Sequence, residues 1–310
     1  MNSVSPADKV VIFYHANCVD GFAAAHVIER HILRDLAQVP ILVPVQYGQV
    51  ETPEQFDALY SDMLKDAEVF IVDFSFPSAV MDHIAKTAQK TYWLDHHKTA
   101  FEEMKFDISK RYDLWAGPNF YLVLDNSKCG AMLAWELVHG VGAEAPDFIK
   151  VVDDYDRWVF QYPQTKDAQM YIRSHSMDRD AFDSLMLMSM DEMAQAGGMM
   201  RQYYNAQLEA HKKRQPMHVN FNDQPGLALN ADAAFSSELG HYLAKKSKTF
   251  GVVYQVEGTK IKFSLRSCGD YDVSALAKIF GGGGHKNAAG FTCDADVFFS
   301  QDGVLYDPQS

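Results

Sequence analysis

The stretch Trp93-Leu94-Asp95-His96-His97-Lys98 places three side chains that can bind metal directly after a short apolar run. The run itself, residues 91–94, is typical of a β-strand. Neutral imidazole and carboxylate groups suit divalent ions such as Mn²⁺ or Zn²⁺. Because side chains alternate along a strand, both histidines could bind one ion only at a bend that follows it. We therefore expect one histidine to bind metal and the other to face a substrate, the alternative being two surface histidines in a polar turn.

The same pattern recurs at two other predicted strands. Residues 10–14 form a continuous apolar run, typical of a strand buried on both faces, and His15 and Asp20 follow it. Residues 68–72 form a second run that ends in Asp73. Helical patterns separate these strands, which predicts a doubly wound, mainly parallel α/β sheet. Parallel strands place their carboxyl ends at one edge, so we expect a metal site there.

The composition limits the class of protein. The chain has 310 residues and a net charge of −13, which argues against a long, sequence-independent contact with duplex DNA. Its four cysteines are scattered without a CxxC pair, as suits a reducing cytoplasm. We find no signal-peptide core and no apolar run of ~18 residues, so we expect a soluble, cytoplasmic protein that does not bind membranes.

The character of the sequence changes after residue 174. Seven methionines fall between positions 177 and 200, and residues 191–214 are predicted to form one long helix with a bend at Gly197-Gly198. Beyond residue 216, a hairpin-like pair of strands and a short helix over 273–280 predict a smaller α/β domain. The expected organisation is a metal-binding domain over residues 1–185, a helical connector over 186–215 and the smaller domain over 216–310.

Two further motifs carry functional side chains. Asp153-Asp154-Tyr155-Asp156 ends an apolar run, and such a cluster of like charges is costly unless it is solvated, paired or bound to a cation. Four glycines, Gly281 to Gly284, precede His285. Successive glycines let backbone N–H groups approach an anion closely. The alternative is a floppy loop, which its position between a helix and an apolar strand disfavours.

In their order along the chain, these motifs resemble the DHH phosphoesterases that carry the DHH-associated C-terminal domain. The resemblance rests on His15 to Gly21, Asp73, Asp95-His96-His97, the 153–156 run and Gly281 to His285. It implies two α/β domains with the active site in the cleft between them. It also implies a dinuclear site, usually occupied by Mn²⁺, with Mg²⁺ as the other candidate.

The resemblance further implies a role for each residue. Asp73 would bridge the two ions, one of which would also be held by Asp20, His96 and Asp154, and the other by His15. His97 would face the scissile phosphate, and Asp95 would orient the histidines. We prefer Asp154 to Asp156 because Arg157-Trp158 aligns with a basic-aromatic pair that often follows the family's ligand. Substrate phosphates would be held in the C-terminal domain by Arg266, Gly282, Gly283, Gly284 and His285.

The chain departs from the family at the first motif. The family usually has Asp-x-Asp-Gly, and this chain has Cys18-Val19-Asp20-Gly21. Cys18 could bind as a thiolate, which would favour a softer ion. Asn17 could bind through its amide oxygen instead, or the site could fill only when substrate is present.

Among the family's activities, we expect metal-dependent hydrolysis of very short oligonucleotides, such as linear 5′-phosphorylated dinucleotides, to mononucleotides. The acidic charge and the lack of a further nucleic-acid module disfavour exonuclease action on long strands. No sensor or transmembrane segment precedes the catalytic domain, unlike the membrane-bound cyclic-dinucleotide enzymes. The alternatives are a nucleotide bisphosphate phosphatase, a cyclic-dinucleotide phosphodiesterase, or a nucleotide-binding regulator that lost catalysis with the missing acid. A homodimer is left open.

Overall fold

The computed structural model describes residues 9–36 and 38–295, and the chain divides into two compact units, Met1–Arg201 and Gln202–Ser310. Residues 1–8 and 296–310 of the predicted first and last domains lie outside the described residues. The first unit contains a six-stranded sheet with the order β2-β1-β3-β4-β6-β5. Its strands are β1 (Lys9–His15), β2 (Ile41–Val45), β3 (Ala67–Val72), β4 (Lys90–Asp95), β5 (Tyr112–Trp115) and β6 (Phe120–Leu124). Only the pairing of β5 with β6 is antiparallel, so the predicted mainly parallel α/β sheet is confirmed.

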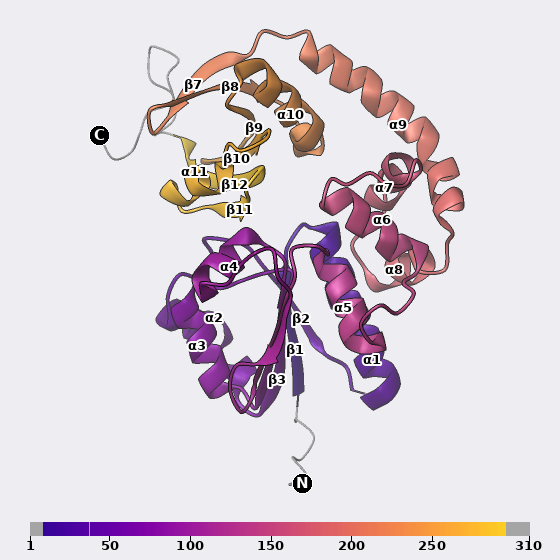
Figure 1. Ribbon diagram of the computed structural model, residues 1–310, viewed down its shortest axis with the longest axis vertical. Coiled ribbons are helices and arrows are strands. Elements are labelled where there is room, and N and C mark those ends of the chain that lie inside the picture. Colours follow the sequence, from indigo (N-terminus) through magenta and orange to yellow (C-terminus); the bar gives the residue numbers. More distant parts are fainter. Residues whose placement is uncertain (1–8, 37, 296–310) are drawn as a thin grey trace. The chain divides into compact units, whose positions relative to one another are not determined.

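Helices cover both faces of this sheet (Figure 1). Along β1, Val10 and Ile12 point into one core and Val11 and Phe13 into the other, as the continuous apolar run predicts. The first core is covered by α1 (Val19–Leu36), α5 (Gly130–His139), α6 (Asp147–Asp156) and α8 (Arg179–Leu185). The second is covered by α2 (Pro53–Leu64), α3 (Ser78–Thr87) and α4 (Lys98–Met104).

The remaining helices of this region are α7 (Thr165–Arg173) and the long α9 (Met190–Lys212), which the sequence predicted over 191–214. A Cβ atom on Gly197 would lie 1.8 Å from the carbonyl oxygen of Asp167, whereas one on Gly198 would meet nothing within 4 Å. Gly197 therefore permits α9 to lie against α7. The division between the units falls inside α9, and the predicted domain limits at residues 185 and 215 stay a prediction.

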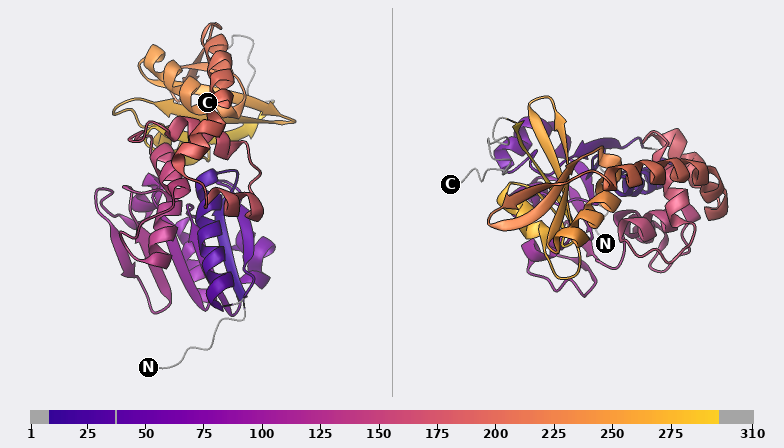
Figure 2. Two further views of the ribbon diagram at one scale, coloured as in Figure 1. Left: turned by 90° about the vertical axis from the view of Figure 1, so that its right-hand side faces the viewer. Right: turned by 90° about the horizontal axis from the view of Figure 1, so that it is seen from above.

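The second unit contains a six-stranded, mainly antiparallel sheet with the order β11-β12-β10-β9-β8-β7. Its elements are β7 (Met217–Phe221), β8 (Gln224–Asn230), η1 (Ala233–Phe235), α10 (Ser236–Ser247), β9 (Phe250–Glu257), β10 (Lys260–Ser267), α11 (Val273–Ile279), β11 (Gly283–His285) and β12 (Ala288–Asp294). The strands appear in orange and yellow in both views of Figure 2. Along β10, Phe263 and Leu265 point into the core shared with α11, while Arg266 alternates to the face covered by α10.

None of the helices over residues 9–36 and 38–295 has the length and apolar composition that a membrane span requires.

Candidate active site

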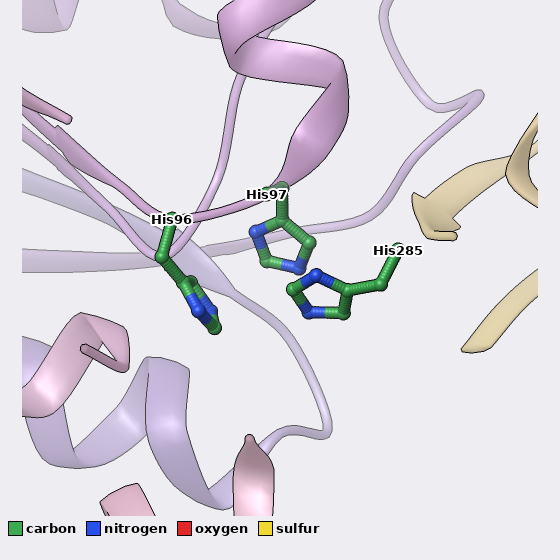
Figure 3. Close-up of side chains that lie close together, drawn as sticks. All are labelled: His96, His97 and His285. Carbon is green, nitrogen blue, oxygen red and sulfur yellow. The ribbon is translucent and has the colours of Figure 1, made fainter. Parts of the chain in front are cut away.

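The ends of three neighbouring strands bring the predicted site residues of the first unit together. His15 is the last residue of β1, Asp73 follows β3, and Asp95 ends β4. These strands are adjacent and parallel, so their carboxyl ends meet at one edge of the sheet. His96 and His97 leave β4 at the same edge, with ring centroids 4.6 Å apart (Figure 3).

Asp73 is the residue that the surrounding histidines share. Its Oδ1 atom lies 3.0 Å from Nε2 of His96 and 3.7 Å from Nδ1 of His97, and its Oδ2 atom lies 3.5 Å from Nδ1 of His15. The backbone of Asp73 has a φ of 54°, in the left-handed region that aspartate tolerates better than most residues. Burial raises the pKa of Asp73, but the imidazoles of His15 and His96 more than offset this and hold the pKa well below its usual value. Its two oxygens face different histidines, and the bridging role of Asp73 stays a prediction.

Asp20 links this edge to the first turn of α5. Its carboxylate accepts hydrogen bonds from the N–H groups of Gly130 and Ala131, both at 2.7 Å, and its Oδ2 atom lies 3.5 Å from Nε2 of His96. A Cβ atom on Gly130 would lie 2.6 Å from Cβ of Asp73, so only glycine allows the helix to approach this closely. Burial and the nearby carboxylate of Asp73 raise the pKa of Asp20 well above its usual value. Sequence reasoning missed Gly130, because no local pattern marks such a contact.

Asp95 holds both histidines in place. Its Oδ1 atom accepts the N–H groups of His96 at 2.7 Å and His97 at 3.1 Å, and it lies 2.7 Å from Nδ1 of His97. Ser75 donates to its other oxygen. Burial lowers the pKa of His97, but the charge of Asp95 outweighs burial and the pKa is raised. Burial likewise acts against the charge on His96, yet Asp73 and Asp156 raise the pKa of His96 to about 9.

The three carboxylates of the acidic run of α6 have different partners, and the structure does not bring Asp154, the preferred ligand, to the cluster. Asp154 is fully buried and turned away: its carboxylate accepts from the N–H groups of Gln161 at 2.8 Å and Tyr162 at 3.3 Å, and from the hydroxyl of Thr165. Asp156 instead has its Oδ2 atom 3.6 Å from Nε2 of His96.

Asp153 also has its partners outside the cluster. It accepts from the N–H of Cys129 at 2.7 Å and from Arg157 Nε at 3.1 Å. Asp156 is thus the carboxylate of this run that reaches the cluster, and burial raises its pKa.

At the first motif, the structure brings Cys18 rather than Asn17 to the cluster. Potential ligand atoms of His15, Cys18 and Asp73 all lie within 4.8 Å of one another. Asn17 is exposed and has a φ of 57°. Burial and the charges of Asp73, Asp156 and Asp20 raise the pKa of the Cys18 thiol well above its usual value.

Tyr47 is a further member of the site that sequence reasoning missed. It lies in the turn after β2, and its ring is 4.6 Å from that of Phe74, 5.5 Å from that of His15 and 6.1 Å from that of His97, measured between centroids. An aromatic residue in a turn carries no signal of this placement. Tyr47 packs against the imidazoles of His15 and His97, and Phe74 against that of His15, which limits how far these rings can rotate.

The donor set fits a divalent cation. Asp20, Asp73 and Asp156 all approach the same nitrogen of His96. Among the described residues, the buried atoms without a hydrogen-bond partner include Asp73 Oδ2, Asp156 Oδ2 and His15 Nδ1. Buried carboxylates at such short range repel one another unless a cation lies between them. Carboxylate oxygen and imidazole nitrogen are ligands that Mn²⁺ accepts.

In the second unit, the arginine and the glycines predicted to bind phosphate make contacts within the domain. Arg266 donates to Ser237 Oγ at 3.1 Å and to the carbonyl of Leu265 at 2.9 Å. A Cβ atom on Gly282 would lie 2.0 Å from the carbonyl oxygen of Gly290, and Gly284 has a φ of 135°. Residues 283–285 form β11, paired with β12, so the alternative of a floppy loop is wrong. Phosphate binding by Arg266, the glycines and His285 stays a prediction.

The fold and the cluster define a class of protein: two α/β units, the first with carboxylates and imidazoles at the carboxyl edge of a parallel sheet. Residues 229–298 match the family model of the DHHA1 domain. The resemblance is confirmed: the chain has the fold of a DHH-family phosphoesterase and carries a DHHA1 domain in its second unit.

Three known proteins are similar to this chain. An uncharacterized protein of Acanthamoeba polyphaga mimivirus is 28% identical over 302 residues, which are 93% of this chain and 69% of the relative. An exopolyphosphatase-related protein from Bacteroides fragilis has a TM-score of 0.51 at 15% identity, covering 92% of this chain and 87% of the other. CDC45 from Entamoeba histolytica has a TM-score of 0.50 at 10% identity, covering 84% of each chain. The two structural likenesses show the shared fold.

Proposed function

We propose that the protein is a metal-dependent phosphodiesterase that hydrolyses very short oligonucleotides, such as linear 5′-phosphorylated dinucleotides, to mononucleotides. The observation that carries this proposal is the cluster at the sheet edge, in which Asp20, Asp73 and Asp156 all approach His96. The three carboxylates and His96 would hold one divalent ion, and His15 faces the other oxygen of Asp73, where a second would lie. Such ions, Mn²⁺ in the first place, would supply the charge that activates water and neutralises phosphate oxygens.

The residues of the chain itself set the geometry of this reaction. Asp95 fixes the ring of His97 through Nδ1, so His97 would face a phosphate through Nε2. Asp20 is fixed by the first turn of α5, and Asp73 by its left-handed backbone between β3 and the next turn. The cluster is therefore preorganised, which lowers the cost of placing a phosphate between its charged groups.

An aromatic turn beside Asp156 supports a nucleotide as the substrate. The backbone of Trp158 has a φ of 59° and that of Phe160 a φ of 55°, and bulky residues adopt such values only where the surroundings enforce them. The buried carboxylate of Asp154 enforces the turn by binding the N–H groups that follow it. Trp158 is 37% exposed and its ring centroid lies 4.7 Å from that of Phe160. Aromatic faces held in this way are suited to stacking with nucleobases.

A panel of substrates tests the proposal. Purified protein with Mn²⁺ would be incubated with 5′-phosphorylated RNAs of two to seven nucleotides, a cyclic dinucleotide, a nucleoside bisphosphate and inorganic tripolyphosphate, with products separated by chromatography. We expect mononucleotides from the dinucleotide, and no turnover by His96→Ala or Asp156→Asn. His83→Ala is the matched control, because His83 pairs with Asp57 on the surface. Protein that binds the dinucleotide without cleaving it, or that cleaves only tripolyphosphate, would refute the proposal.

A further inference from the structure

We propose that His15, Cys18 and Asp73 form a half-site that selects a thiophilic ion, Zn²⁺ or Co²⁺, next to a half-site of Asp20, Asp73, His96 and Asp156 that takes Mn²⁺. The inference rests on the proposed function, since it concerns the metal content of the same cluster. It goes beyond that function because it assigns two different ions to the two halves.

Three potential ligand atoms converge on the first half-site. They belong to His15, Cys18 and Asp73 and lie within 4.8 Å of one another. Asp73 is only 1% exposed, and its Oδ2 atom is buried without a hydrogen-bond partner. The Nδ1 atom of His15, 3.5 Å from that oxygen, has none either. A cation bound beside the thiol would satisfy both atoms.

The local backbone positions the sulfur. The left-handed conformation of Asn17 turns the chain between β1 and α1, and the carbonyl of Cys18 accepts the N–H of Phe22 at 3.0 Å. The Gly21 N–H faces the thiol, so Cys18 stands at the amino end of an 18-residue helix. A cation bound there would take the place of the thiol proton, because a thiol that coordinates a metal is deprotonated. Gly21 cannot be larger, since a Cβ atom there would lie 2.5 Å from the carbonyl oxygen of His15.

The two half-sites differ in chemistry. One offers a thiolate, an imidazole and one oxygen of a shared carboxylate, a set typical of Zn²⁺ and Co²⁺. The other offers three carboxylates and an imidazole, which suits Mn²⁺. The competing explanation is that Cys18 only caps α1. In that case serine would replace it without any change in metal binding.

Titration of the full-length, metal-free protein with Co²⁺ distinguishes the two explanations. A bound thiolate gives an intense charge-transfer band in the near-ultraviolet, which carboxylate and imidazole ligands do not give. We expect this band in the unmodified protein and its loss in Cys18→Ser. Cys129→Ser is the matched control, since Cys129 is a second free cysteine of the first unit and its thiol contacts Asp20; this variant should keep the band. A band that is absent from the unmodified protein, or that is lost with Cys129 and kept without Cys18, overturns the proposal.

A second variant measures selectivity. Cys18→Asp restores an oxygen ligand and should weaken Zn²⁺ binding at one of two sites by about 10- to 100-fold, with a gain for Mn²⁺. Metal content after dialysis against both ions, measured by mass spectrometry, gives the ratio, and circular dichroism checks that each variant is folded. Unchanged Zn²⁺ and Mn²⁺ contents in folded Cys18→Asp would refute the inference. These measurements do not depend on turnover, so a thiolate band in a protein without phosphodiesterase activity would refute the proposed function alone.

Discussion

The Nε2 atom of His96 lies 3.0 Å from Oδ1 of Asp73, and both side chains are almost completely buried. A buried pair of this kind is costly to desolvate, and two further carboxylates approach the same nitrogen. The arrangement is explained if a cation shares these groups. Metal binding should therefore stabilise the first unit.

Mn²⁺ should raise the midpoint of thermal unfolding. At a concentration one hundred times the dissociation constant, a ligand of the folded state alone adds about 2.7 kcal/mol. We expect a rise of about 5–10 °C for a domain of this size, abolished by a chelator and by His96→Ala. The four tryptophans, at positions 93, 115, 135 and 158, all lie in the first unit, so their fluorescence reports its unfolding. An equal rise in His96→Ala would place the metal elsewhere.

Changing Asp154 to asparagine should lower stability, whereas changing Asp156 to asparagine should lower metal affinity. Asp154→Asn removes the charge that accepts two N–H groups and should lower the free energy of unfolding by about 1–3 kcal/mol. Asp156→Asn should leave urea unfolding of the metal-free protein nearly unchanged, or stabilise it, because burial, with the charge of Asp73, outweighs the attraction to His96 and disfavours the charged carboxylate. It should lower Mn²⁺ affinity, measured by calorimetry. The opposite assignment of the two effects would restore Asp154 as the ligand.

Gly130→Ala should weaken metal binding although Gly130 is not itself a ligand. The added methyl group would lie 2.6 Å from Cβ of Asp73, so α5 or Asp73 must shift. We expect Mn²⁺ affinity to fall about 10- to 100-fold, as when other groups that position ligands are changed. Gly198→Ala is the matched control in α9, where a Cβ atom meets nothing, and it should stabilise the helix by up to about 1 kcal/mol. Full metal affinity in Gly130→Ala would show that the contact relaxes freely.

Trp158→Ala should weaken the binding of substrates that carry bases. Stacking on an aromatic side chain contributes about 1–3 kcal/mol per base, which corresponds to a rise in KM of roughly 5- to 150-fold. Trp158→Tyr should retain most of the affinity. An abasic analogue of the dinucleotide, with the same phosphates, should be cleaved equally by all three proteins. Equal losses with both substrates would mean that the substitution disturbs Asp156 instead.

The first unit should lose stability between neutral pH and about pH 5 through His26. This residue of α1 is 1% exposed and lies 3.2 Å from Asp183 of α8; burial lowers its pKa, although the nearby charges of Asp183 and Glu29 act in the opposite direction. The unfolded chain then takes up the proton at a higher pH, near 6.5, than the folded chain. Stability is therefore present above about pH 6.5 and falls below it, by at most about 1.4 kcal/mol per pH unit. Urea unfolding of the unmodified protein and of His26→Gln should diverge only below that pH.

The sheet and most of the cluster could be predicted because strand ends converge by topology. A run of apolar residues followed by a polar one marks where each strand stops, and parallel pairing brings the ends of β1, β3 and β4 together. His15, Asp73 and His96 therefore followed from local patterns alone. The resemblance to DHH phosphoesterases then supplied a role for each residue, and these roles stay predictions.

The choice between Asp154 and Asp156 could not be made from the sequence. Residues two apart on a helix face different directions, and which one faces the cluster depends on how α6 is rotated in its packing. The glycine run shows the same limit. Its composition favoured an anion site. In the structure, Gly282 and Gly284 are required because the backbone of β12 lies close to them, and such a contact between separate segments leaves no mark in the local sequence.

The carboxylate of Asp20 connects metal occupancy to the motion of a helix end. Its two oxygens hold the N–H groups of Gly130 and Ala131, and one of them also lies near His96. A cation drawn to that oxygen competes with the Gly130 N–H for the same lone pairs. The exchange of that amide hydrogen with solvent should therefore respond to metal while the deeper turns of α5 do not. The exchange rate of the Gly130 amide would then report whether the cluster holds a cation.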